Sequence, residues 1–179
     1  INYRNYNNKF QNYYSSPIGE QSNIANERGI YSAFSILINN RLNLFLAGDY
    51  FNFPNQSYRA NKSVSGYKIR SELNYTINKY HILTLLYKQN NRPYNETHTN
   101  EEEYPEDNIL KQIQLRYTLN PNENLMLKTR IGYSQTQTYT SNKNKGAFIS
   151  QDLIFKPDKS SLSFNFRLAY FNTNDYDNA

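Results

Sequence analysis

The chain has 179 residues, enough for one domain, and its composition shows no break that would divide it into two. The absence of cysteine excludes a disulfide framework and thiolate chemistry, and the Lys and Arg behind the net charge of +5 are spread singly, which does not support nucleic-acid binding. A mean hydropathy of −0.89 would suit a disordered chain, but eighteen Tyr and ten Phe favour a patterned β-sheet instead.

Alternation of apolar and polar residues recurs in segments of about ten to thirteen residues, the length that a tilted strand needs to cross a bilayer. In residues 67–77, one face carries Tyr67, Ile69 and Leu73, while the intervening positions are charged or polar. In chain order the pattern predicts nine strands, at residues 1–7, 28–38, 42–53, 67–77, 81–90, 109–119, 125–134, 147–156 and 162–170.

The predicted connections alternate strictly between short and long. Short turns rich in Asn or containing Pro are expected at residues 39–41, 78–80, 120–124 and 157–161. Long polar loops are expected at residues 8–26, 54–65, 91–108 and 137–145. Short periplasmic turns and long external loops are typical of outer-membrane barrels.

The short turns also predict which residues face each other. A three-residue turn at 39–41 pairs Ile38 with Leu42, Ile36 with Leu44 and Phe34 with Leu46. A five-residue turn at 120–124 pairs Leu119 with Leu125, Tyr117 with Leu127 and Ile113 with Ile131. Both registers keep one face apolar, which matters because a slip of one residue moves every side chain to the opposite face.

Two architectures fit such strands: a transmembrane barrel with its apolar face toward lipid, and a soluble sandwich with that face inward. The strand length favours the barrel. We therefore expect six charged strand residues to form a polar network in the lumen: Arg70, Glu72, Arg116, Arg130, Asp152 and Arg167. Six aromatic residues near the long-loop ends are expected to form an interfacial girdle: Tyr50, Phe51, Phe53, Tyr67, Tyr133 and Tyr170.

The sequence predicts no catalytic, cofactor or metal site, and we do not expect an enzyme. The two histidines, His81 and His98, are separated by a strand and a loop. The acidic run at residues 101–107 lacks the spacing and the glycine of a calcium loop and is interpreted as a solvated loop.

Several segments resemble a known family of membrane proteins. They are Asn26-Glu27-Arg28-Gly29-Ile30-Tyr31, Gly48-Asp49-Tyr50-Phe51-Asn52-Phe53-Pro54, Ser65-Gly66-Tyr67, Gln151-Asp152-Leu153 and residues 167–177. From residue 26 onward the chain resembles the C-terminal barrel of Bacteroidota outer-membrane proteins labelled helix-hairpin-helix domain proteins. The resemblance implies an antiparallel up-and-down barrel in the outer membrane. The helical module that precedes the barrel in that family has no match here.

The first functional hypothesis is thus a bacterial outer-membrane barrel that serves as channel, transporter component or assembly scaffold. Its expected partners are outer-membrane lipid and lipopolysaccharide, with other outer-membrane or periplasmic proteins. The alternative is a soluble β-sandwich that binds a glycan or a protein. Because the directions of nine strands place residues 174–179 outside the cell, we also expect residues 1–179 to form a single barrel segment that further strands complete.

Overall fold

The computed structural model describes residues 1–10, 19–20, 25–56, 60, 62–93, 105–138, 143–158 and 161–174. These residues contain nine strands: β1 (Asn2–Tyr6), β2 (Glu27–Asn39), β3 (Leu42–Phe53), β4 (Val64–Asn78), β5 (His81–Asn91), β6 (Asn108–Asn122), β7 (Leu125–Thr138), β8 (Asn144–Phe155) and β9 (Phe164–Thr173). In this described part of the chain, no helix is long and apolar enough to span a membrane.

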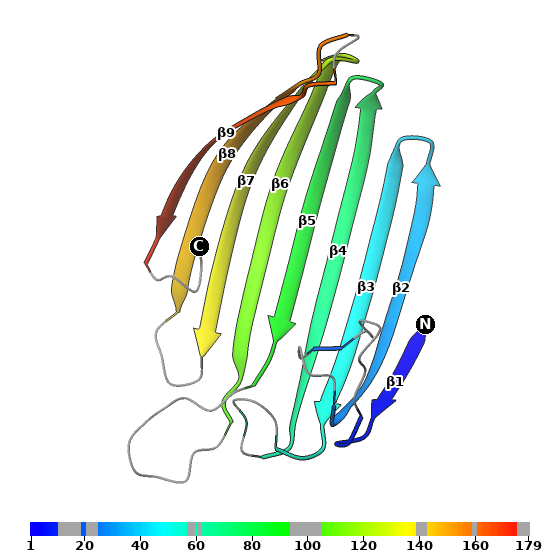
Figure 1. Cartoon of the computed structure of the whole chain (residues 1–179), viewed down its shortest axis with the longest axis vertical. Helices are drawn as coiled ribbons and strands as arrows, with labels where there is room; N and C mark the ends of the chain where they lie inside the picture. The colour runs from blue at the N-terminus through cyan, green and yellow to red at the C-terminus, as the bar shows by residue number, and fades with distance from the viewer. Residues whose placement is uncertain are drawn as a thin grey trace.

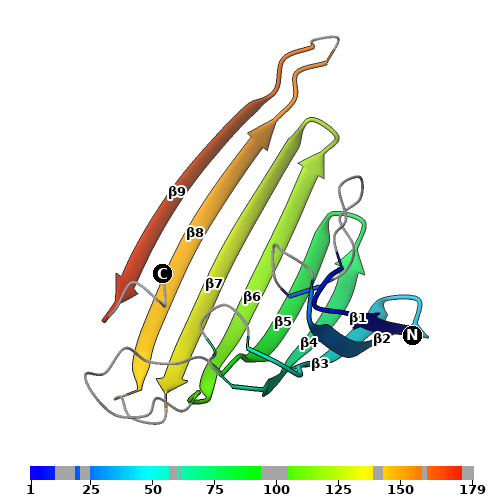
Figure 2. The same cartoon turned by 60° about the horizontal axis from the view of Figure 1, so that its bottom comes forward.

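All nine strands belong to one antiparallel sheet in which each strand pairs with the next along the chain. The predicted all-β, up-and-down architecture is therefore confirmed. The sheet is strongly curved and twisted (Figures 1 and 2), and it is not closed: β1 and β9 form its two edges. The short turns lie at one end of the sheet, at the top of Figure 1, and the other connections leave from the opposite end.

Three of the short turns share one construction. Asn39, Asn78 and Asn122 each accept, through Oδ1, a hydrogen bond from the backbone amide two residues later, at 2.9–3.0 Å. This local bond closes the chain within two residues, as asparagine side chains commonly do in turns. The pairing partners at the turn are then Asn39 with Leu42, Asn78 with His81 and Asn122 with Leu125.

The third residue of each of these turns also contacts the following hairpin. The carbonyl oxygen of Arg41 accepts a hydrogen bond from the amide of Thr76 at 2.7 Å. Tyr80 accepts in the same way from Asn120 at 2.8 Å, and Asn124 from Lys156 at 2.7 Å. Backbone bonds thus join successive hairpins beyond the regular ladder.

This construction corrects two predicted registers. Phe34 faces Leu46 and Ile36 faces Leu44, as predicted, but a bulge between Leu37 and Asn39 places Asn39, and not Ile38, opposite Leu42. The turn after β6 is shorter than predicted, because β6 continues to Asn122. The observed pairs are therefore Leu119 with Leu127, Tyr117 with Thr129 and Ile113 with Tyr133. The slip is two residues, so every side chain stays on its predicted face.

The buried core is small and lies near the ends of β3 and β4. Phe51, Phe53, Ala60 and Val64 form it, and Phe51 is fully buried. Gly66 lies against the Phe51 ring: a Cβ atom there would come within 2.5 Å of the ring and of the Asn91 carbonyl oxygen. Close packing of this cluster thus depends on the absence of a side chain at residue 66.

Candidate functional site: a charged face opposite an apolar face

One face of the sheet is apolar and exposed. The register places on it Leu44, Leu73, Leu85, Leu115 and Ile131, each directly opposite the next on β3 to β7. Exposure reaches 52% for Ile131 and 65% for Phe166 on the edge strand β9. None of the described residues covers this face with a second layer, since all nine strands belong to one sheet. It is therefore not the interior of a sandwich formed by the described strands.

A row of polar residues borders the apolar face near the strand ends that lead into the longer connections. Gln89, Lys111, Gln135 and Lys145 lie directly opposite one another on β5 to β8. Just inside this row, Tyr87 donates a hydrogen bond to Gln89 Oε1 at 2.7 Å. The Gln89 amide in turn donates to the Tyr67 hydroxyl at 2.7 Å. Tyrosines therefore mark the border between the apolar residues and the polar row.

Of the six residues predicted to form the girdle, four lie on the apolar face and two do not. Tyr50, Tyr67 and Tyr133 lie on the apolar face beside this border, as the register shows. Tyr170 lies on the same face but farther from the border, in one row with Ile149 and Ile131. Phe51 and Phe53 belong to the buried core on the opposite face. Because side chains alternate along a strand, Phe51 cannot share a face with Tyr50.

The opposite face, called the charged face below, carries the six residues predicted for the polar network. Register places Arg70 and Glu72 there on β4, Arg116 on β6, Arg130 on β7, Asp152 on β8 and Arg167 on β9. Most of the buried strand residues also lie on this face, including Thr84, Thr118, Ser134 and Ser150. Polar side chains are therefore closely packed on the charged face, whereas large apolar side chains are exposed on the apolar face.

Five of the six residues make ion pairs, in two groups. Asp152, only 5% exposed, accepts from Arg130 and also from Arg167, whose Nε lies 2.6 Å from Oδ1. Arg70 donates to Glu72 Oε2 at 2.7 Å. Arg116 faces Arg130 across the β6–β7 pair and forms no ion pair with a described carboxylate. The structure thus brings together Arg130, Asp152 and Arg167, and separately Arg70 and Glu72.

A further ionic cluster was not predicted from the sequence. Arg4 donates from Nε to Glu27 Oε1 at 2.5 Å, and its two terminal nitrogens donate to Asp49 at 2.7 and 3.1 Å. Arg4 reaches Asp49, two strands away, because Gly29 lies between them and has no side chain. The other Glu27 oxygen accepts from the Glu20 amide at 2.9 Å.

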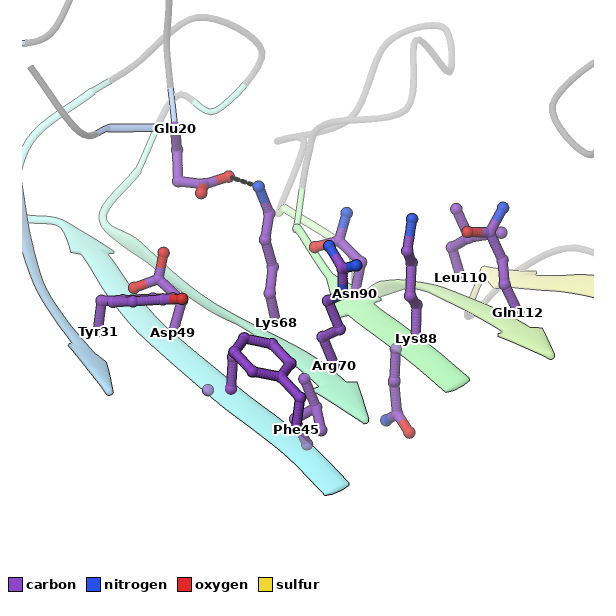
Figure 3. A pocket seen from close by; sticks show the side chains of 14 residues that line it. Glu20, Tyr31, Phe45, Asp49, Lys68, Arg70, Lys88, Asn90, Leu110 and Gln112 are labelled. Atoms are coloured by element: carbon purple, nitrogen blue, oxygen red, sulfur yellow. Dashed lines mark ion pairs between the residues drawn. The ribbon is translucent and has the colours of Figure 1, made fainter. Parts of the chain in front are cut away.

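A cavity of about 420 Å³ adjoins this cluster on the charged face. Figure 3 shows Lys68, Arg70 and Lys88 extending from β4 and β5 to the same side, where the Glu20 carboxylate pairs with Lys68 at 2.6 Å. Asn90 and Gln112 add side-chain amides, and Tyr31 and Phe45 line another part of the wall. The cavity thus offers cations and amide donors beside aromatic surface.

His81 does not contribute to the charged face. His81 is at the start of β5, where its Nδ1 lies 2.5 Å from the Tyr117 hydroxyl oxygen. His98 and the first part of the acidic run, residues 101–104, lie outside the described residues. Among the residues that are described, no group of His, Asp and Glu is arranged to hold a metal ion.

Comparison of the chain with protein-family models, with curated proteins and with solved structures finds no match.

Proposed function

We propose that this sheet is part of the wall of a β-barrel in a bacterial outer membrane, where it works as a channel, transporter component or assembly scaffold. The observation that carries the proposal is the inverted burial: large apolar side chains are exposed on one face, whereas charged and small polar ones are buried on the other. A bilayer stabilises the first face, and a hydrated lumen suits the second.

The dimensions of the apolar face support this function. On β4 the apolar positions extend from Tyr67 to Ile77, about eleven residues or ~36 Å at ~3.3 Å each. A strand tilt of about 45° reduces this length to ~25 Å along the membrane normal, the height of the apolar band in such barrels. The bordering tyrosines and polar row fit the interface with lipid head groups.

A bilayer also imposes a requirement on the two edges of the sheet. Unpaired backbone groups are costly in hydrocarbon, so a β-sheet that spans a membrane must be closed and have no open edge. We therefore propose that further strands cover the edges at β1 and β9 and complete the wall. The apolar face would contact lipid and lipopolysaccharide, while the connections at the sheet ends are available to other outer-membrane or periplasmic proteins.

Extraction tests the proposal against a soluble sandwich that binds a glycan or protein. A membrane barrel is expected in the outer-membrane fraction, to remain there through a high-salt wash and to require detergent for release. Unboiled samples should migrate differently from boiled ones on a denaturing gel. Recovery of folded protein in the soluble fraction would contradict the proposal and favour the sandwich-like alternative, in which another protein layer covers the apolar face.

A further inference from the structure

The charged face contains an unusual cross-strand pair of like charges. Arg70 on β4 lies directly opposite Lys88 on β5, and both side chains extend to the cavity side (Figure 3). Like charges directly opposite each other in a sheet are destabilising unless something neutralises them. Gln112, an amide donor, follows directly opposite Lys88 on β6. Three donors therefore lie in one row across three adjacent strands.

The carboxylates of the cavity are already engaged elsewhere. Asp49 accepts two hydrogen bonds from Arg4. The Glu20 carboxylate pairs with Lys68. Neither is thus available to balance Lys88. Glu72 balances Arg70, whereas the structure shows no ion pair between Lys88 and any described carboxylate, so Lys88 carries the uncompensated charge of the row.

Arg70 is oriented before any ligand arrives. One terminal nitrogen is held by Glu72, and the guanidinium carbon lies 5.8 Å from the centre of the Phe45 ring. Its side chain is nevertheless 50% exposed, so further N–H groups remain accessible. A guanidinium fixed in this way loses less conformational entropy when it binds an oxyanion.

We propose that this cavity binds a small molecule through a phosphate group held between Arg70 and Lys88, with Gln112 as a third donor. Adjacent strands lie about 4.8 Å apart, so one phosphate can accept from both cations. A phosphate monoester carries a charge of about −1.5 to −2 at neutral pH and has three acceptor oxygens, so it can pair with Lys88 and also accept from the free N–H groups of Arg70, which Glu72 already balances. The volume of about 420 Å³ lies within the range of small-molecule sites.

The inference goes beyond the proposed function, and phosphate binding itself does not depend on it. Only the choice of a free solute over a lipid head group rests on the proposed function, because the cavity opens on the face opposite the one proposed to contact lipid. Binding can be measured on the purified protein whether detergent is needed or not, so a failure of the membrane proposal and a failure of this one are distinguishable.

The test is a titration of inorganic phosphate, followed by ³¹P NMR, with the purified protein in a phosphate-free buffer and a sugar-headed detergent. Saturable binding is expected, and Lys88→Gln should weaken it at least about tenfold. Lys88→Arg, which keeps the charge, should retain binding. Lys128→Gln is the matched control, because it removes the same charge from the same face outside the cavity lining, and it should change affinity less than about twofold.

Three results would overturn the proposal. The first is the absence of saturable phosphate binding to the unmodified protein. The second is equal weakening by Lys88→Gln and Lys128→Gln, which would indicate attraction to the general positive charge of the face. The third is displacement of phosphate by acetate at equal concentration, which would assign the site to carboxylates.

Discussion

Arg4 of β1 and Glu27 of β2 form an ion pair at 2.5 Å in which both side chains are almost completely buried. Asp49 of β3 binds the other end of the same guanidinium, so one arginine connects the first three strands. A buried charge is stabilising only where its partners are present, since an unpaired one retains the cost of its lost hydration.

The first prediction concerns this pair. Glu27→Gln removes the charge facing Arg4 and should lower the free energy of unfolding by about 1–3 kcal/mol, the usual cost of leaving a buried polar group unsatisfied. Urea unfolding followed by far-UV circular dichroism measures the change. Glu72→Gln is the control, because its partner Arg70 is half exposed and such pairs contribute less than about 1 kcal/mol. Equal effects of the two substitutions would contradict the structure.

The second prediction compares two glycines. Gly66→Ala introduces a Cβ atom into the Phe51 ring and the Asn91 carbonyl oxygen, and should destabilise the protein by about 1–3 kcal/mol through overpacking. Gly48→Ala places the same methyl group where no atom lies within 4 Å, and should be neutral or stabilising by up to ~1 kcal/mol. Thermal melting of both variants provides the measurement. A larger loss of stability for Gly48→Ala than for Gly66→Ala would contradict the close packing of Gly66 against Phe51.

The third prediction tests the turn after β6. Asn122→Ala removes the acceptor for the amides of Asn124 and Leu125 and should cost about 1 kcal/mol. Asn122→Asp keeps an oxygen at that position and should restore most of the loss. If alanine were tolerated as well as aspartate in urea unfolding, the side-chain hydrogen bonds would not hold the turn.

The fourth prediction tests which face contacts lipid. Leu115→Arg should cost about 2–4 kcal/mol if the residue lies near the middle of the bilayer. Gln114→Arg, one residue away on the charged face, should cost much less. Spin labels at the same two positions give a second reading: the label at 115 should be accessible to oxygen, and the label at 114 to a water-soluble nickel complex. The opposite accessibilities would exclude the proposed orientation.

The strands and their faces could be predicted because each face has its own chemistry. In β4, large apolar residues recur on one face, while Lys68, Arg70 and Glu72 occupy the other. A two-residue error in the predicted strand pairing leaves every side chain on its correct face. The exact register was harder to predict. Between Leu119 and Leu125 the sequence Asn-Pro-Asn-Glu-Asn offers several possible turn residues, and the choice of Asn122 depends on hydrogen bonds that composition does not reveal.

The cluster around Arg4 illustrates a second limit. Its contact with Asp49 joins residues 45 positions apart and crosses an intervening strand. The one hint in the sequence is Gly29, which leaves room for the Arg4 side chain. This can be recognised only when the register is known to place Gly29 opposite Arg4. The cavity is similar, since Arg70 and Lys88 are neighbours only when β4 and β5 are correctly aligned. Side-chain contacts between strands can thus be predicted only when the register is known, whereas the face on which a side chain lies follows from the alternation along its own strand.

The backbone bonds that join the turns after β2, β4 and β6 to the following hairpin have a consequence for how such a sheet can grow. The acceptor at Arg41, Tyr80 or Asn124 is fixed by its own hairpin, while the donor comes from the next one. Each of these hairpins therefore presents a carbonyl oxygen that accepts a hydrogen bond from the next hairpin, and this bond does not involve more distant strands. A sheet of this kind can be widened by one whole hairpin without rearranging those already present, so duplication of a hairpin-encoding segment is a physically simple route to a wider sheet.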